Sequence, residues 1–332
     1  MWLSKWLVVM LVFFGTPLHA ATDANWLRYK QRFIHTDGRV IDTGNQNISH
    51  SEGQGFGMLF AVAYDDRQTF ERLWRWTQDN LRNETTGLFC WKYNPNVAEP
   101  IEDRNNASDG DVLIAWALLK AGNQWNQPQY QQASDQILHS LLTHNIIDFA
   151  GKKVMLPGTV GFTFPSSITL NPSYFIYPAW QDFLSHSHLL DLQSLIDDTL
   201  QLMLDINWGK NKIATDWVTL HIDGTTSPAA QWPARASYDA IRIPVYIGWR
   251  NPSHQLLSRW QGLFSAYDRL STPAWEAVTG NQKADYPMSG GLLAVRDFTM
   301  GELTPSSTQI SDQDDYYSAS LKLLVELAGS GY

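Results

Sequence analysis

Two patterns of hydrophobic and polar positions alternate along the chain. One kind of stretch is small, apolar or aromatic on nearly every side, as at 54–64, 112–122, 173–184 and 240–249. The other kind carries apolar residues on one helical face only, as at 67–81, 128–143, 189–206 and 254–267. In residues 67–81, for example, Phe70, Leu73, Trp74 and Leu81 share a face. Both patterns predict helices, because the apolar positions recur with a helical period.

The alternation of the two patterns predicts the architecture. A helix that is apolar all round must be buried all round, whereas an amphipathic helix covers a core from outside. We therefore expect an all-α (α/α)6 toroid, in which an inner ring of helices is wrapped by an outer ring. Residues 290–295 and 315–328 give a fifth inner and outer pair, and a further helix is expected near 25–34. That makes eleven helices, one fewer than the twelve of a six-pair toroid, and we place the remaining element around 270–285. β-Prone segments at 154–164 and 216–226 predict short hairpins in the connections.

The first twenty residues differ from the rest of the chain. Lys5 precedes an apolar run over residues 6–14, and the small residue Ala20 follows. This layout predicts a cleavable signal peptide over residues 1–20, because the apolar run is too short to span a bilayer. No linker or low-complexity segment divides residues 21–332, so we expect one domain that is periplasmic or secreted and not inserted in a membrane.

Composition excludes several classes of function. The chain has 332 residues and a net charge of −9, which argues against binding to nucleic acids or anionic membranes. Cys90 is the only cysteine, so no intrachain disulfide can form, and no metal or cofactor motif is present. Aromatic residues make up 13% of the chain and include 15 tryptophans, which suits stacking against sugar rings.

Three carboxylates occupy similar places in the pattern. Glu52, Asp109 and Asp239 each come at or near the beginning of a predicted inner helix. Ser51 and Gln54 match a capping box, which would leave Glu52 free for chemistry. Inner helices run roughly parallel, so their N-termini should open on one rim and bring the three carboxylates together. The alternative is that such acids only complement helix dipoles, a stabilisation of about 0.3–1 kcal/mol each.

The motifs around these carboxylates resemble glycoside hydrolase family 8. The stretch "ASDGDVLIAWALLKAGNQW", residues 107–125, is similar to the signature of that family. The segment "SEGQGFGM" resembles the family's catalytic-acid segment, and "SYDAIRIP" resembles the segment that carries its base. A pair of carboxyl groups flanking a sugar, one acid and one base, is the chemistry of glycoside hydrolysis.

The resemblance implies an inverting endo-β-1,4-glucanase with an (α/α)6 barrel and no cofactor. Glu52 would be the proton donor, Asp239 would be the base, and Asp109 would hold the central sugar. Four residues would orient the base or line the cleft, namely Arg242, Tyr238, Tyr174 and Trp91. The substrate would be a β-1,4-glucan such as cellulose. The resemblance is to endoglucanases that accompany bacterial cellulose synthase, so the cellulose export machinery is a further expected partner.

Three alternatives remain open from the sequence. A chitosanase or a xylanase of the same family would use the same carboxylates on a different sugar. A non-catalytic glucan-binding component of an export machine would lack the acid or the base. A polysaccharide lyase would need basic residues to neutralise a uronic acid, and the expected rim is acidic.

Overall fold

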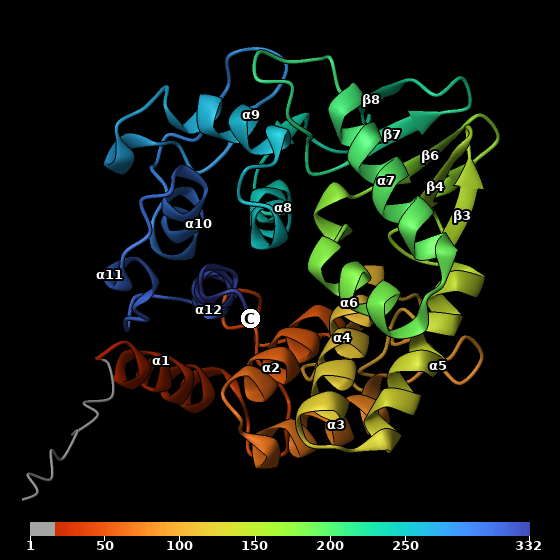
Figure 1. Cartoon of the computed structure of the whole chain (residues 1–332), viewed down its shortest axis with the longest axis vertical. Coiled ribbons are helices and arrows are strands. Elements are labelled where there is room, and N and C mark those ends of the chain that lie inside the picture. Colours follow the sequence, from red (N-terminus) through yellow and green to blue (C-terminus); the bar gives the residue numbers. More distant parts are fainter. Residues whose placement is uncertain (1–16) are drawn as a thin grey trace, which may run out of the picture.

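The computed structural model describes residues 17–332, and twelve α-helices form two concentric rings within them (Figure 1). The inner ring consists of α2 (Ser51–Ala63), α4 (Ser108–Gln124), α6 (Tyr177–Ser187), α8 (Ile243–Arg250), α10 (Gly290–Met300) and α12 (Tyr316–Ser330). The outer ring consists of α1 (Pro17–Phe33), α3 (Arg67–Leu81), α5 (Pro128–His144), α7 (Leu190–Asp205), α9 (Gln255–Phe264) and α11 (Pro305–Thr308). The predicted (α/α)6 toroid is confirmed.

Close packing of α2 against α4 brings two of the predicted site residues together. A Cβ atom added at Gly110 would lie 2.2 Å from Ser51 Oγ and 2.7 Å from the backbone nitrogen of Glu52. A Cβ added at Gly55 would lie 2.5 Å from the Cβ of Leu113. Because glycine lacks a Cβ, the two backbones can approach this closely, and the first turns of both helices become neighbours.

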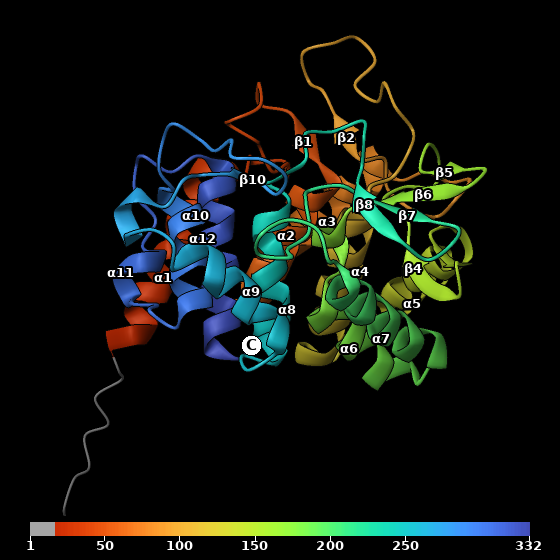
Figure 2. The same ribbon diagram turned by 90° about the horizontal axis from the view of Figure 1, so that it is seen from above.

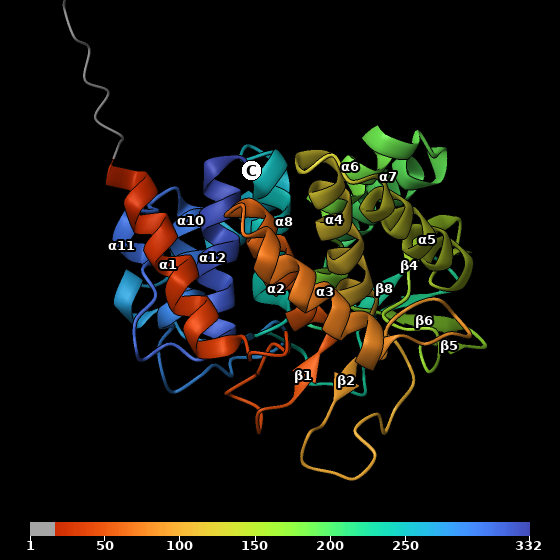
Figure 3. The ribbon, with the colours of Figure 1, turned by 90° about the horizontal axis from the view of Figure 1, so that it is seen from below.

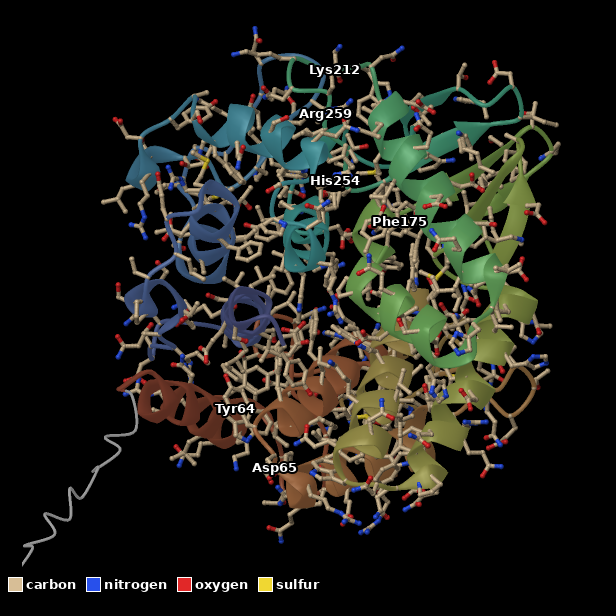
Figure 4. The ribbon with its side chains drawn as sticks, in the orientation of Figure 1. Tyr64, Asp65, Phe175, Lys212, His254 and Arg259 are labelled. Carbon is tan, nitrogen blue, oxygen red and sulfur yellow. The ribbon has the colours of Figure 1, made fainter. Side chains whose placement is uncertain are left out.

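The burial patterns of the two rings follow the sequence. Nearly every residue of α2 and α4 is buried, as expected for helices enclosed on all sides. The outer helix α3 buries the predicted face of Phe70, Leu73, Trp74 and Leu81 and turns its polar residues outward. In α9, the side chain of Arg259 donates to the carbonyl oxygen of Leu204 in the last turn of α7, at 2.7 Å, and to that of Lys212 in the connection after α7, at 2.8 Å (Figure 4).

Two expectations about the helices are wrong. Residues 290–295 and 315–328 do not form an inner and outer pair, because α10 and α12 both belong to the inner ring. The outer helix between them is α11, a single turn of four residues that is too short to show a period in the sequence. Residues 270–285 contain no helix like the others, only the end of a 3-10 turn, η3 (Arg269–Ser271), and the short strand β10 (Glu276–Ala277).

The N-terminal helix is longer than expected. α1 begins at Pro17 rather than near residue 25, so it includes the last four residues of the predicted signal peptide. Residues 1–16, which hold the rest of that segment, lie outside the described residues. The predicted cleavage near residue 20 therefore stays a prediction. Among residues 17–332, no helix has both the length and the apolar character that crossing a membrane requires.

The short strands gather at one end of the barrel, and the C-terminus lies at the other (Figure 2 and Figure 3). An antiparallel sheet contains β5 (Thr163–Phe164), β6 (Ser167–Leu170), β7 (Val218–His221) and β8 (Thr226–Pro228). The remaining pairs are β1 (Ser49–His50) with β2 (Lys92–Tyr93), β3 (Ile146–Phe149) with β4 (Lys152–Met155), and β9 (Arg235–Ala236) with β10. The predicted hairpin regions are confirmed. Inner helices begin at this end, so their connections build the rim of the site.

Candidate active site

Arg242 lies at the centre of the site and contacts all three predicted carboxylates. Its Nη1 donates to Glu52 Oε1, and its Nη2 donates to Asp239 Oδ1 at 3.2 Å and to Ser173 Oγ at 2.8 Å. The same Nη2 lies 3.7 Å from Asp109 Oδ2. Only 4% of the Arg242 side chain is exposed. The expected convergence of the three carboxylates on one rim is confirmed.

Glu52 stands in the first turn of α2, but the predicted capping box is wrong. The N-cap of α2 is His50, whose Nδ1 accepts a backbone N–H of the first turn at 3.0 Å. The side chain of Gln54 turns instead toward the preceding segment, where its Oε1 accepts from the N–H of Val40 at 2.6 Å. Ser51 Oγ has no hydrogen-bond partner among the described residues. His50 therefore does the capping, and the oxygens of Glu52 remain free to face the site.

Asp109, in the first turn of α4, is almost fully buried and faces Glu52. Its Oδ1 accepts the neighbouring N–H of Gly110 at 2.8 Å. Burial, and then the negative charge of Glu52, raise the pKa of Asp109 well above its ordinary value, while Arg242 acts in the opposite direction. Two carboxylates this close do not readily ionise together, which favours retention of a proton at Asp109.

Asp239 does not stand in the first turn of α8 itself. It precedes the 3-10 turn η2 (Ala240–Arg242), which leads into α8, and its side chain is one-third exposed. Removal of water by the surrounding protein raises the pKa of Asp239 to about 6. Arg242 lowers this pKa, whereas the charges of Asp216 and Glu52 raise it further. Asp239 is thus ionised above pH 6 and opens toward solvent.

The structure places the predicted tyrosines at different depths. Tyr174, in η1 (Pro172–Tyr174), has its ring centre 6.0 Å from the guanidinium carbon of Arg242. Burial, followed by the charge of Asp109, raises the pKa of Tyr174 well above its ordinary value. Tyr238 lies further out, with 40% of its surface exposed and its hydroxyl 3.0 Å from the hydroxyl of Tyr286.

Trp91 lies beside the start of α2 but makes no contact with the carboxylates. Its carbonyl oxygen accepts from the N–H of Ser51 at 3.1 Å, and its Nε1 donates to Asp103 Oδ2 at 2.9 Å. These bonds fix the half-buried indole at the rim. A stacking role for Trp91 stays a prediction.

Sequence reasoning missed two residues at the site, Ser173 and Tyr317, and also Asp216, which lies behind the segment that carries Asp239. Tyr317 stands in the first turn of α12, and the charges of Arg242 and Glu52 both act on its hydroxyl. The rule that first turns of inner helices face the rim would have found it, had residues 315–328 been assigned to the inner ring. Ser173 lies in η1 and Asp216 lies just before β7, and each begins a stretch whose apolar or β-prone pattern indicates packing rather than a site.

Comparison with known proteins identifies this arrangement. The profile of Glycosyl hydrolases family 8 matches residues 1–331, which is nearly the whole chain. The chain belongs to glycoside hydrolase family 8. A relative from Cellulomonas uda, described as an endoglucanase, is 52% identical over 277 residues, covering 83% of this chain and 77% of that protein.

Solved structures of family 8 enzymes agree with the fold. Endoglucanase Cel10 from Klebsiella pneumoniae superposes with a TM-score of 0.91 at 52% identity, covering 93% of this chain and 99% of that one. Endo-β-1,4-glucanase CMCax from Acetobacter xylinum superposes with a TM-score of 0.88 at 32% identity, covering 94% and 98%. The predictions of the family and of a glycoside hydrolase are confirmed. Within residues 17–332, no group of His, Cys, Asp and Glu is arranged to hold a metal ion.

Proposed function

We propose that this family 8 hydrolase is an inverting endo-β-1,4-glucanase, with Glu52 as general acid and Asp239 as general base. The observation that carries the proposal is the single guanidinium of Arg242, which holds both carboxylates on different nitrogens. One acid and one base are therefore fixed in a common frame, with Glu52 facing Asp109 and Asp239 opening toward solvent.

The general acid must carry a proton near neutral pH, and the proximity of Asp109 to Glu52 favours retention of a proton there. Burial, and then the charge of Glu52, raise the pKa of Asp109, which favours a proton held between the two carboxylates. Glu52 delivers this proton to the departing glycosidic oxygen. Asp109 then remains beside the central sugar as an acceptor for its hydroxyls.

The base needs the opposite protonation state. Asp239 has a pKa of about 6 and is ionised above that pH, so it can take a proton from an attacking water. Its partial exposure gives water access to the carboxylate. Attack by this water from the side opposite the departing oxygen inverts the anomeric centre.

The substrate assignment is supported by the relatives and by the residues at the rim. The protein from Acetobacter xylinum is described as an endo-β-1,4-glucanase, and that from Cellulomonas uda as an endoglucanase. Around the carboxylates, Tyr174, Tyr238 and Trp91 offer aromatic surface for glucose rings. An open rim built from long connections suits a polymer that is cut internally.

Two amide substitutions test the catalytic roles. Glu52→Gln and Asp239→Asn should each fold normally and lose nearly all hydrolysis, since a proton-transfer role is typically worth about 10²–10⁴-fold in rate. Glu326→Gln is a matched control, because Glu326 accepts from Asn25 Nδ2 at 2.8 Å and from the hydroxyl of Tyr64 at 2.8 Å, away from the carboxylate cluster. Hydrolysis at the unsubstituted rate by either the Glu52 or the Asp239 variant would refute the assignment.

A substrate panel separates the proposal from the other activities of the family. Release of reducing ends should be fastest on carboxymethylcellulose and slower on xylan and chitosan. Chitosan is the informative competitor, because a cationic polymer is attracted to a protein with a net charge of −9. Faster cleavage of chitosan would replace the glucan with that substrate and leave the roles of the carboxylates intact.

We also propose that the enzyme works outside the cytoplasm, where it trims or degrades cellulose as it is exported. The support is the charged, apolar and small-residue layout of residues 1–20, together with the resemblance to endoglucanases that accompany cellulose synthase. Fractionation of cells and sequencing of the mature N-terminus test the export. A full-length chain in the membrane fraction would contradict it.

A further inference from the structure

Asp216 is a buried carboxylate in the connection before β7, and it binds the segment that carries Asp239. Its Oδ1 accepts from the N–H of Ser237 at 2.8 Å and from the N–H of Ala240 at 2.9 Å. Its Oδ2 accepts from the hydroxyl of Ser237. Its own N–H donates to the carbonyl oxygen of Arg235 at 3.0 Å. Only 8% of Asp216 is exposed.

These bonds fall on both sides of Asp239. Arg235 and Ser237 precede it, and Ala240 follows it, so Asp216 binds the segment on both sides of Asp239. The pairing of β9 with β10 and the hydroxyl of Tyr317, which donates to the carbonyl oxygen of Tyr238, hold the same segment from other directions. Asp239 is the N-cap of η2, yet its side chain makes no capping bond. Asp216 instead accepts from the N–H of Ala240, which has no partner within the turn. The carboxylate of Asp239 is therefore free to bind Arg242 and water.

The charge of Asp216 has no cationic partner within residues 17–332. Three hydrogen-bond donors, two backbone N–H groups and the hydroxyl of Ser237, contact its carboxylate instead. The charged and titratable groups that act on Asp239 are Arg242 on η2, Asp216, Glu52 on α2, Tyr174 on η1 and Tyr317 on α12. Among them, Asp216 and Glu52 raise the pKa of Asp239, and Arg242 lowers it.

We propose that Asp216 is a positioning residue for the hydrolysis, which holds the Asp239 segment in its working orientation and acts on Asp239 through its charge. This inference rests on the proposed role of Asp239 as the base. In this role Asp216 contacts neither the attacking water nor the sugar, because its oxygens accept hydrogen bonds from Ser237 and Ala240. Its contribution is to the placement and the ionisation of another carboxylate.

Three variants test the proposal on uncharged cello-oligosaccharides, with kcat and KM measured across pH. Asp216→Asn should lower kcat about tenfold or more with little change in KM, because small displacements of a reacting group cost up to about 100-fold. It should also move the acidic limb of the kcat/KM profile to lower pH, since a negative charge near Asp239 is lost. Asp216→Glu keeps the charge but displaces the carboxylate, so kcat should fall without that downward shift. Ser237→Ala should lower kcat less and leave the limb in place.

Asp66→Asn is the matched control, because Asp66 caps α3 by accepting from the N–H of Thr69 at 3.0 Å and has no contact with the Asp239 segment. It should leave both kcat and the pH profile unchanged. A folded Asp216→Asn protein with unchanged kcat and limb would overturn the proposal. If that variant does not fold, unchanged kcat in both Asp216→Glu and Ser237→Ala would overturn it. Asp239→Asn distinguishes a failure of this inference from a failure of the proposed function. Activity of the Asp239→Asn enzyme would refute the assignment of Asp239 as the base. The role of Asp216 is refuted only if the Asp216 and Ser237 variants are unaffected.

Discussion

Replacement of Arg242 by methionine would remove the one positive charge that the three carboxylates share. Methionine keeps an unbranched apolar stem, which is shorter than that of arginine, and it cannot donate a hydrogen bond to a carboxylate. The bonds lost are those to Glu52, Asp239 and Ser173, and with them the charge that lowers the pKa of Asp239 and of Asp109.

The size of the effect on Asp239 follows from the contact distance. At the 3.2 Å between Arg242 Nη2 and Asp239 Oδ1, two unit charges interact by about 5 kcal/mol at an effective dielectric of ~20 and by about 1 kcal/mol in bulk water. Asp239 is one-third exposed, so solvent screening favours a value of about 2–3 kcal/mol. Each 1.4 kcal/mol is a factor of ten in ionisation, so the acidic limb of the pH profile should rise by about 1.5–2 pH units.

The base must be ionised to work. If the acidic limb of the pH profile moves to higher pH, the enzyme therefore loses activity at every pH below the new limb. At pH 6, where half of Asp239 is ionised in the unsubstituted enzyme, the Arg242→Met enzyme should be slower by about 15- to 50-fold from this cause alone. Stability should also fall, by about 3–5 kcal/mol near neutral pH, since buried carboxylates are left without a partner. Because the folded protein then binds protons more tightly than the unfolded chain, this loss should grow from pH 5 to pH 8.

The assay is kcat/KM against pH, together with urea unfolding at pH 5 and pH 8. Arg242→Lys should recover part of the limb position, because it restores the charge without the two-nitrogen geometry. Arg296→Met is the control for loss of a buried arginine, since Arg296 pairs with Asp297 and Glu302 instead. It should lower stability and leave the acidic limb in place. An unmoved limb in folded Arg242→Met would refute the reasoning.

Further predictions follow from the proposed mechanism. Asp109→Asn should lose most turnover but still bind cello-oligosaccharides, as calorimetry would measure; loss of binding with intact kcat would contradict its assignment. The viscosity of carboxymethylcellulose should fall well before reducing ends accumulate, whereas slow loss of viscosity would indicate cleavage from chain ends. The first product from β-linked glucan should be the α-anomer by proton NMR before mutarotation. An initial β-anomer, or a glycosyl ester on Asp239, would mean retention and overturn the roles of Glu52 and Asp239.

The fold could be predicted because burial leaves a direct trace in the sequence. Helices enclosed on all sides, such as residues 112–122, must be apolar on all sides, and outer helices such as 67–81 must be amphipathic. The reasoning failed where an element is too short to have a period. The single turn of α11 has only four residues, so no period predicted it, and residues 315–328 were assigned to the outer ring in its place.

The site was predictable to the extent that it follows from helix direction. Parallel inner helices bring Glu52 and Asp109 to one rim, and the family motif adds Asp239 and Arg242. Asp216 and Ser173 were missed because they act from connections, where contacts depend on the three-dimensional path of the chain. The capping box was wrong for a related reason. Gln54 has the right spacing for a cap, but its amide is buried against Val40 and the hydroxyl of Thr77, and a buried amide needs partners there.

The question of what caps these helices bears directly on the chemistry. A carboxylate in a first turn normally stabilises exposed N–H groups and is itself stabilised in the ionised form, which lowers its pKa. Here His50 caps α2, and Asp216 caps the turn that leads into α8. With capping assigned to other residues, Glu52 and Asp239 keep their oxygens for Arg242, water and sugar. The pKa of Asp239 is raised to about 6 despite a nearby helix start and a bound arginine. The removal of water, which raises the pKa of Asp239, therefore outweighs the positive charge of Arg242, which lowers it. This balance gives the base a pKa close to the pH at which it must accept a proton.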